Sequence, residues 1–239
     1  MSTGPLLVTA RLASPLALGA DGPPQLDALL EWSLSPFYVG DQKRFEPGFK
    51  ITRSGPAPPQ GAIPIPILRV SIPPWNVAMC SDAILPASGE TVEHVNKRLA
   101  SEAADLLRPE ERKIVSTTNT WTKSYRLPLR VLAVPCVRWF CHGNRRNLLK
   151  ALRDVRALGK KVSDGYGRIS GWEAEDTPED HSWFAKHPDG VTVLMRRLPL
   201  LCDGRAWLPE NLVGCKCDFG ACCPPYWHPE RNTEVMVPC

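Results

Sequence analysis

A short apolar strand, a basic helix and a glycine-rich loop follow one another between Trp139 and Trp172, and this run restricts the fold most strongly. Asn144 is a residue type that caps helices, so a helix is expected to begin there, and Gly159 is expected to end it as a C-terminal cap. The apolar face of this helix comprises Leu148, Leu152, Val155 and Leu158, which recur with helical spacing. The later glycines allow positive φ and the close approach of another backbone. The run therefore predicts a strand–helix–strand unit with an unusual connecting loop.

The same run is strongly basic. From Arg138 to Arg168 there are nine Lys or Arg residues and two acids, Asp154 and Asp164, which gives a local charge of +7. The whole chain carries +4, so the remaining residues sum to −3. A cationic patch on a mildly acidic body is typical of proteins that hold a phosphate backbone. The alternative is an ordinary amphipathic helix with a solvated basic face, followed by a tight turn.

Candidate RNA contacts lie on the helix and in the loop after it. The loop amides and the cations beside them are expected to face a polyanion together, and Tyr166, between two glycines, is expected to be free to stack on a base. Gly165 and Gly167 are expected to have positive φ or to contact the RNA backbone. The candidates in this run are Arg138, His142, Arg145, Arg146, Lys150, Lys160, Lys161, Gly165, Tyr166, Gly167 and Arg168.

A second group of candidates lies in the sequence WTKSYR, within an expected hairpin arm at about 117–128. The group comprises Trp121, Lys123, Tyr125 and Arg126. Alternation places the first three on one face of a strand, where two aromatic rings and a cation can clamp a base. The alternative is a core strand in which both aromatic rings are buried.

The expected order of elements is typical of an α+β fold. Strands are expected at Leu6 to Leu12, Ile65 to Ile72, Leu129 to Cys141 and Arg168 to Glu173, and helices at Leu26 to Leu34, Glu90 to Leu107 and after Asn144. This order predicts a ferredoxin-like (RRM-like) domain over residues 1–200, with insertions between its halves. One insertion is the proline-rich stretch at about 55–75, and a Cys- and Pro-rich extension follows over 201–239.

Composition fits a chain with a substantial core. Its 239 residues are 43% hydrophobic, and no apolar run reaches the roughly 20 residues that a membrane span needs. We therefore expect a cytoplasmic protein without a membrane partner. In that compartment the nine cysteines are expected to be free thiols or metal ligands rather than disulfides.

Three pieces of the chain carry a resemblance to a known family. The run VRWFCHGNRRNLLKALRDVRALGKKVSDGYGRISGW, the opening LLVTARLASPLA with PQLDALLEW, and the late MRRLPL with PPYWHP resemble the Cas five type (RAMP superfamily) subunit of type IV CRISPR effector complexes. These pieces cover about two thirds of the chain in the expected order, and the GKKxxxGYG loop after a basic helix is the most specific of them.

The resemblance implies a RAMP domain and a non-catalytic role in antiviral or antiplasmid defence. Such a subunit grips the 5′ handle of the guide RNA (crRNA) and caps the filament of backbone subunits beside the large subunit. Target DNA is first inspected nearby. The implied partners are therefore guide RNA and the other subunits of the ribonucleoprotein, and no cofactor is required.

Two rival functions are weighed against this one. The first is a Cas six type endoribonuclease that processes guide RNA, for which His142 beside the arginine pair is the best-placed general acid or base. The second is a zinc-containing protein adaptor. Its candidate ligands are Cys215, Cys217, Cys222 and Cys223 in GCKCDFGACC, although their spacing is unlike that of a zinc knuckle. Otherwise the tail is a loop with reduced thiols. Its Pro-Pro-Tyr-Trp run is expected to dock on a neighbouring subunit or back across the same domain.

Overall fold

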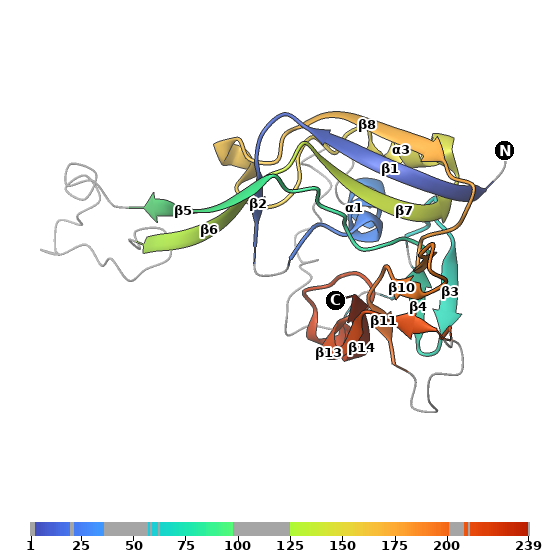
Figure 1. The fold of residues 1–239 in the computed structure, drawn as a ribbon. Helices are drawn as coiled ribbons and strands as arrows, with labels where there is room; N and C mark the ends of the chain where they lie inside the picture. Colours follow the sequence, from blue (N-terminus) through green and yellow to red (C-terminus); the bar gives the residue numbers. More distant parts are fainter. Residues whose placement is uncertain are drawn as a thin grey trace, which may run out of the picture.

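The computed structural model describes residues 3–19, 22–35, 57, 59–61, 63–97, 125–200, 208–209 and 211–238. Within them the chain is a sheet-rich α+β structure in which small antiparallel sheets predominate (Figure 1). This agrees with the α+β class that the sequence predicts.

The central sheet has the order β7-β1-β8 and is antiparallel throughout. Its strands are β1 (Gly4–Leu12), β7 (Cys136–Gly143) and β8 (Ile169–Asp176). Val8 of β1 lies opposite Trp139 on one side and Ala174 on the other, and all three side chains are buried. Helices α1 (Leu26–Leu34) and α3 (Arg145–Leu152) contribute to the same hydrophobic cluster and pack against each other. One face of the sheet therefore holds the main core.

A further segment lies along the outer edge of β7. Isolated antiparallel bridges join Ile67 to Gly143, Cys80 to Cys141, and Ile84 to Arg138. Within this segment the hairpin β3 (Arg69–Ile72) and β4 (Trp75–Ala78) forms from the end of the proline-rich stretch. The predicted strand at 65–72 is therefore shorter and belongs to this hairpin.

A long arm leaves the body beside the central sheet (Figure 1). It is built from β5 (Gly89–Lys97) and β6 (Tyr125–Ala133), and β2 (Leu16–Leu18) pairs with the base of β6. The predicted helix at 90–107 is wrong over 90–97, and its remainder lies outside the described residues. The spacing of Val92 and Val95 fits a helix, but nine antiparallel pairs with β6 supply the backbone hydrogen bonds instead.

The predicted strand at 129–141 is two strands. β6 ends at Ala133 and β7 begins at Cys136, so the chain leaves the arm sheet and enters the central sheet across Val134 and Pro135. Pro135 has no N–H to continue a ladder, and its carbonyl accepts a hydrogen bond from Leu12.

The C-terminal part forms two small sheets below the central sheet (Figure 1). One has the order β12-β10-β9 and the other β11-β14-β13. The strands are β9 (Phe184–Lys186), β10 (Thr192–Leu194), β11 (Leu198–Pro199), β12 (Leu212–Val213), β13 (Cys215–Ala221) and β14 (Asn232–Pro238). Because β11 pairs with β14, the predicted boundary at residue 200 cuts through a sheet. The tail is thus built into the fold rather than appended to it.

No helix among the described residues is long and apolar enough to cross a membrane.

Candidate nucleic-acid interface

Helix α3 begins where the sequence predicts and ends earlier. The Asn144 side chain accepts a hydrogen bond from the backbone N–H of Asn147 at 3.0 Å, which is the expected cap. The helix ends at Leu152 rather than at Gly159. Val155 and Leu158 are nevertheless buried, because the chain turns and keeps both side chains in the core. The predicted apolar residues are therefore right, although only part of them is helical.

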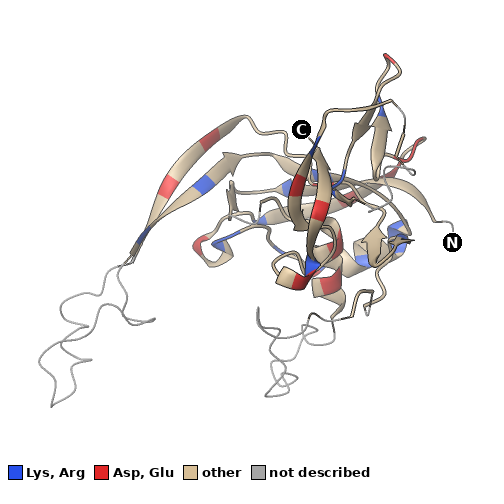
Figure 2. Ribbon diagram, turned by 90° about the horizontal axis from the view of Figure 1, so that it is seen from below, with Lys and Arg blue, Asp and Glu red and all other residues tan. Residues whose placement is uncertain are grey.

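The outer surface of α3 carries a line of cations that continues past its end. Arg146, Lys150 and Arg153 are exposed and follow helical spacing. Arg156 and Arg168 lie beyond the end of the helix and are also exposed, and the antiparallel bridge between Ala157 and Arg168 joins the two segments that carry them. We call these five residues the cationic stripe. Figure 2 marks the Lys and Arg residues of the described chain in blue and the acidic residues in red.

Four members of the cationic stripe have no carboxylate partner among the described residues, and Arg153 lies 3.5 Å from Asp154. Arg153 and Arg156 were not among the predicted contacts. The excess of Lys and Arg over acidic residues in this segment is the sequence feature that could have indicated these two arginines.

The glycine loop has the backbone that the sequence predicts. Gly159, Gly165 and Gly167 have φ of 80°, 96° and 63°, and Lys161 also has positive φ at 56°. A short 3-10 helix, η2 (Val162–Asp164), lies between them. Positive φ at these glycines is thereby confirmed.

The loop amides do not face outward as expected. The N–H of Lys160 donates to the Ala17 carbonyl and that of Gly167 to the Pro15 carbonyl, both at 2.8 Å. The N–H of Gly165 donates to Val162. The amides of Lys160 and Gly167 therefore hold the loop against β2 and the residue before it, and these three amides are not available to a polyanion. Among the cations of this run, Lys161 lies 3.6 Å from Asp164, and Arg168 is exposed.

Tyr166 is not free to stack on a base. Its hydroxyl donates a hydrogen bond to Glu93 of β5, and its ring packs against the cluster of Ala17, Leu129 and Val131. Flanking glycines leave a tyrosine mobile only when nothing else contacts its side chain. Here the arm contacts the side chain of Tyr166. Tyr166 instead fixes the base of the arm to the glycine loop.

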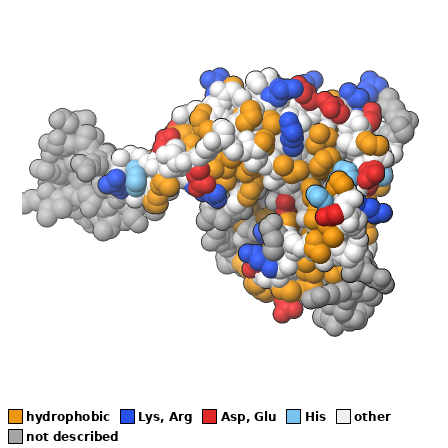
Figure 3. Space-filling view, viewed as in Figure 1, with side chains coloured by type: hydrophobic (Ala, Val, Ile, Leu, Met, Phe, Trp, Pro, Cys, Tyr) orange, Lys and Arg blue, Asp and Glu red, His pale blue; other side chains and the backbone are white. Residues whose placement is uncertain are grey.

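His142 and Arg145 are engaged by carboxylates. His142 Nδ1 lies 2.8 Å from Asp180 Oδ2, and Arg145 Nη1 lies 3.4 Å from Asp176 Oδ2. Partial burial would raise the pKa of Asp180, but hydrogen bonds from Ser182 and His142 outweigh it and lower that pKa. The Asp180 side chain is therefore ionised at neutral pH. Figure 3 shows histidine and acidic side chains together on the body, at the end away from the arm.

The other predicted contacts lie apart from α3. Arg138 pairs with Thr9 on the face of the central sheet opposite the helices. Tyr125 and Arg126 begin β6 on the arm, whereas Trp121 and Lys123 lie outside the described residues. The structure therefore distributes the predicted residues over the helix and loop, the open face of the sheet, and the arm.

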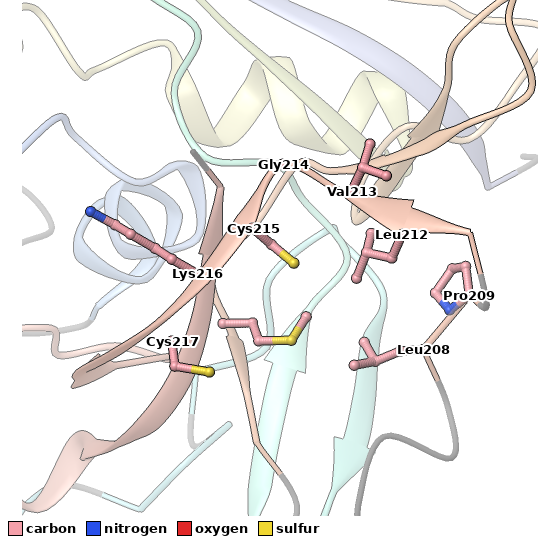
Figure 4. Close-up of a pocket in the computed structure, with 9 residues that line it drawn as sticks. Leu208, Pro209, Leu212, Val213, Gly214, Cys215, Lys216 and Cys217 are labelled. Atoms are coloured by element: carbon pink, nitrogen blue, oxygen red, sulfur yellow. The ribbon is translucent and has the colours of Figure 1, made fainter.

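The four tail cysteines are spread along an extended strand. Cys215 and Cys217 belong to β13, and they border a cavity of about 490 Å³ with Leu212 and Met236 (Figure 4). Cys222 and Cys223 are buried past the end of β13. Five residues of extended chain span roughly 16 Å, which is too far for four thiols to bind one ion.

Within the described ranges there is accordingly no cluster of three or more His, Cys, Asp or Glu side chains suited to a metal ion. The four candidate cysteines are thus not gathered at one point in the part of the chain that the structure describes.

No protein-family model matches this chain, and no curated protein matches it either.

Proposed function

We propose that this protein is a non-catalytic RNA-binding subunit that holds guide RNA through the cationic stripe of α3. The observation that carries the proposal is the exposure of Arg146, Lys150, Arg156 and Arg168 without a carboxylate partner among the described residues. Clustered like charges repel one another, and a bound polyanion relieves this repulsion.

Some cations elsewhere on the surface are paired with carboxylates. Arg11 makes two hydrogen bonds to Glu173, at 2.5 and 2.9 Å. Arg130 pairs with Glu90 in the same way on the arm. Four members of the cationic stripe have no such partner among the described residues, and they lie close together in the sequence.

The arrangement of the body supports a ferredoxin-like domain within the proposal. The bridged segment from Ile67 to Ile84 extends the order β7-β1-β8 by one edge, and both helices cover one face. In this reading the arm is an insertion between the edge segment and β7. A fold of this kind hosts many functions, so the site carries the argument.

The place of the subunit in a complex rests on the sequence resemblance. We propose a Cas five type role in a type IV CRISPR complex, in which the protein grips the 5′ handle beside the backbone and large subunits and near target DNA. The exposed residues Arg146, Asn147 and Lys150 of α3 offer a surface to a strand of RNA.

One observation favours the rival endoribonuclease. The Asp180 carboxylate orients the His142 imidazole at 2.8 Å, an arrangement that general bases also use. Incubation of the pure protein with repeat RNA in EDTA separates the two functions. A single defined cut that is lost in His142→Ala would favour the nuclease, and intact RNA would favour the binding subunit.

RNA binding is tested with matched charge removals. Arg146→Gln with Lys150→Gln should weaken binding to repeat RNA, and the plot of log affinity against log salt should become shallower by about 1.4, because each phosphate contact contributes about 0.7. The control, Arg11→Gln with Arg130→Gln, changes the net charge equally at positions that are already paired. Equal effects of the two pairs would show that only the net charge matters and would contradict the proposed site.

A further inference from the structure

The two ends of the central sheet carry opposite charge. Strands β7 and β8 both run antiparallel to β1, so they finish at the same end of the sheet. There His142 lies opposite Pro5, and Asp176 lies opposite the next residue, Leu6. Residues 173–180, which we call the acidic segment, contain no Lys or Arg and five carboxylates: Glu173, Glu175, Asp176, Glu179 and Asp180.

Two carboxylates of the acidic segment contact side chains at the end of β7 and the start of α3. Asp180 contacts His142 at 2.8 Å and Asp176 contacts Arg145 at 3.4 Å. The Asp180 carboxylate is held in place on its other oxygen, which accepts a hydrogen bond from the N–H of Ser182 at 2.9 Å. The contact to His142 is thus built into the loop after β8.

The opposite end of the sheet is basic. Arg168 precedes the first residue of β8, and its bridge with Ala157 brings the segment that carries Arg156 to the same end of the sheet. Helix α3 runs between the two ends, with its N-terminus at the acidic end. A helix N-terminus normally attracts phosphate, but here the Asp176 carboxylate lies beside Arg145 of the first turn and repels one.

We propose that the acidic segment is an electrostatic stop that ends the path of bound RNA. The phosphate backbone lies along Arg146 and Lys150 toward Arg168 and does not pass the N-terminus of α3. Asp176 neutralises Arg145 and Asp180 contacts His142, so neither side chain belongs to the path of the RNA in this proposal. The inference rests on the proposed function, since it specifies where RNA lies on that site.

The two carboxylates could instead assist RNA binding, and that role predicts the opposite change in RNA affinity when they are removed. If Asp176 and Asp180 orient Arg145 and His142 toward RNA, removing the carboxylates would weaken binding. If they stop the RNA, removing them frees the Arg145 cation, lowers the negative charge at this end of the sheet and strengthens binding. The sign of one measurement therefore separates the two roles.

The test uses the full chain and a fluorescein-labelled single-stranded RNA of mixed sequence. Asp176→Asn with Asp180→Asn should raise affinity about two- to fivefold, the range of an exposed ion pair, and steepen the salt dependence. The control, Glu175→Gln with Glu179→Gln, removes the same charge from exposed side chains that form no close ion pair in the described ranges. It should change affinity less.

A second measurement addresses Arg145 directly. Arg145→Gln should barely alter affinity in the parent protein and should lower it clearly in the Asp176→Asn background. Equal losses in both backgrounds, or weaker binding on removal of the two aspartates, would overturn the inference. If Arg146→Gln with Lys150→Gln leaves binding unchanged, the proposed function itself fails, and that result is distinct from failure of the stop.

Discussion

Arg196 Nη2 lies 2.6 Å from Asp27 Oδ2, and both side chains are only 1% exposed. The pair joins α1 to the connection between β10 and β11. Arg196 also donates to the Tyr226 hydroxyl at 2.6 Å, and that hydroxyl lies 2.8 Å from Asp27. The N-terminal helix, the MRRLPL motif and the tail are therefore tied by one buried network.

Removing one charge of this network should destabilise the protein strongly. Asp27→Asn leaves the Arg196 guanidinium buried without its counter-charge, which typically costs about 3–5 kcal/mol. Urea unfolding followed by tryptophan fluorescence measures the change in the free energy of unfolding. Tyr226→Phe, which removes one hydroxyl and no charge, should cost about 1–3 kcal/mol. A loss below about 1 kcal/mol for Asp27→Asn would contradict the network's role.

The network also changes what is expected of the tail. Deleting residues 214–239 removes β13, β14 and Tyr226, so the deletion should unfold the body rather than only weaken assembly. Interface roles are better tested at exposed side chains of the tail. Phe219 is 68% and Trp227 40% exposed. Alanine at either position should change the free energy of unfolding by no more than about 0.5 kcal/mol, so a loss of assembly there would report on docking alone.

The two glycines of the loop should respond differently to substitution. A Cβ on Gly167 would lie 2.0 Å from the Leu158 carbonyl oxygen, whereas a Cβ on Gly165 meets nothing within 4 Å. Gly165→Ala therefore carries only the strain of positive φ, about 1–2 kcal/mol. Gly167→Ala adds a backbone clash and should cost more than twice as much. Thermal unfolding compares the two variants, and equal losses would contradict this account.

Sequence patterns located the elements that depend on local signals. Helix α1 has the predicted bounds, Leu26–Leu34, and the Asn144 cap starts α3. Both depend on residue types that act within one or two turns. The arm was missed because the pairing of β5 with β6 joins residues 28 to 44 positions apart, which helical spacing at Val92 and Val95 does not reveal.

The sequence predicted the positive charge of the candidate site, but it did not predict which of its cations pair with carboxylates. The count of Lys and Arg identified α3 and the loop, because net charge is a property of the sequence. Which cations remain unpaired depends on the acidic segment, which only the strand order of the sheet brings to His142 and Arg145. Likewise, nothing local places Glu93 beside Tyr166, 73 positions away.

The pH dependence of stability should report on Glu31. Its carboxylate lies 2.5 Å from Arg69, but burial outweighs that partner and raises the pKa to about 7 from an ordinary 4.5. The folded state then binds this proton more tightly than the unfolded state. Stability from Glu31 is therefore fully present below about pH 4.5 and is lost as the pH rises through about 7. Relative to Glu31→Gln, the parent protein should lose free energy of unfolding across that window. A gain with rising pH would show that pairing with Arg69 dominates.

The tail cysteines should behave as two pairs in different environments rather than as one metal site. Cys217 is exposed and Cys215 is partly exposed at the cavity, whereas Cys222 and Cys223 are buried. A maleimide reagent should therefore label the first pair in the folded protein and reach the second only after denaturation. Burial likewise raises the pKa of Cys141 to about 12, which keeps that thiol protonated and unreactive.

Cys217→Ser should leave the melting temperature unchanged with and without EDTA, because a thiol that holds no ion contributes no metal-linked stability. One equivalent of zinc in the purified protein, together with a melting temperature that falls in EDTA and in Cys217→Ser, would instead restore the zinc adaptor as the better account of the tail.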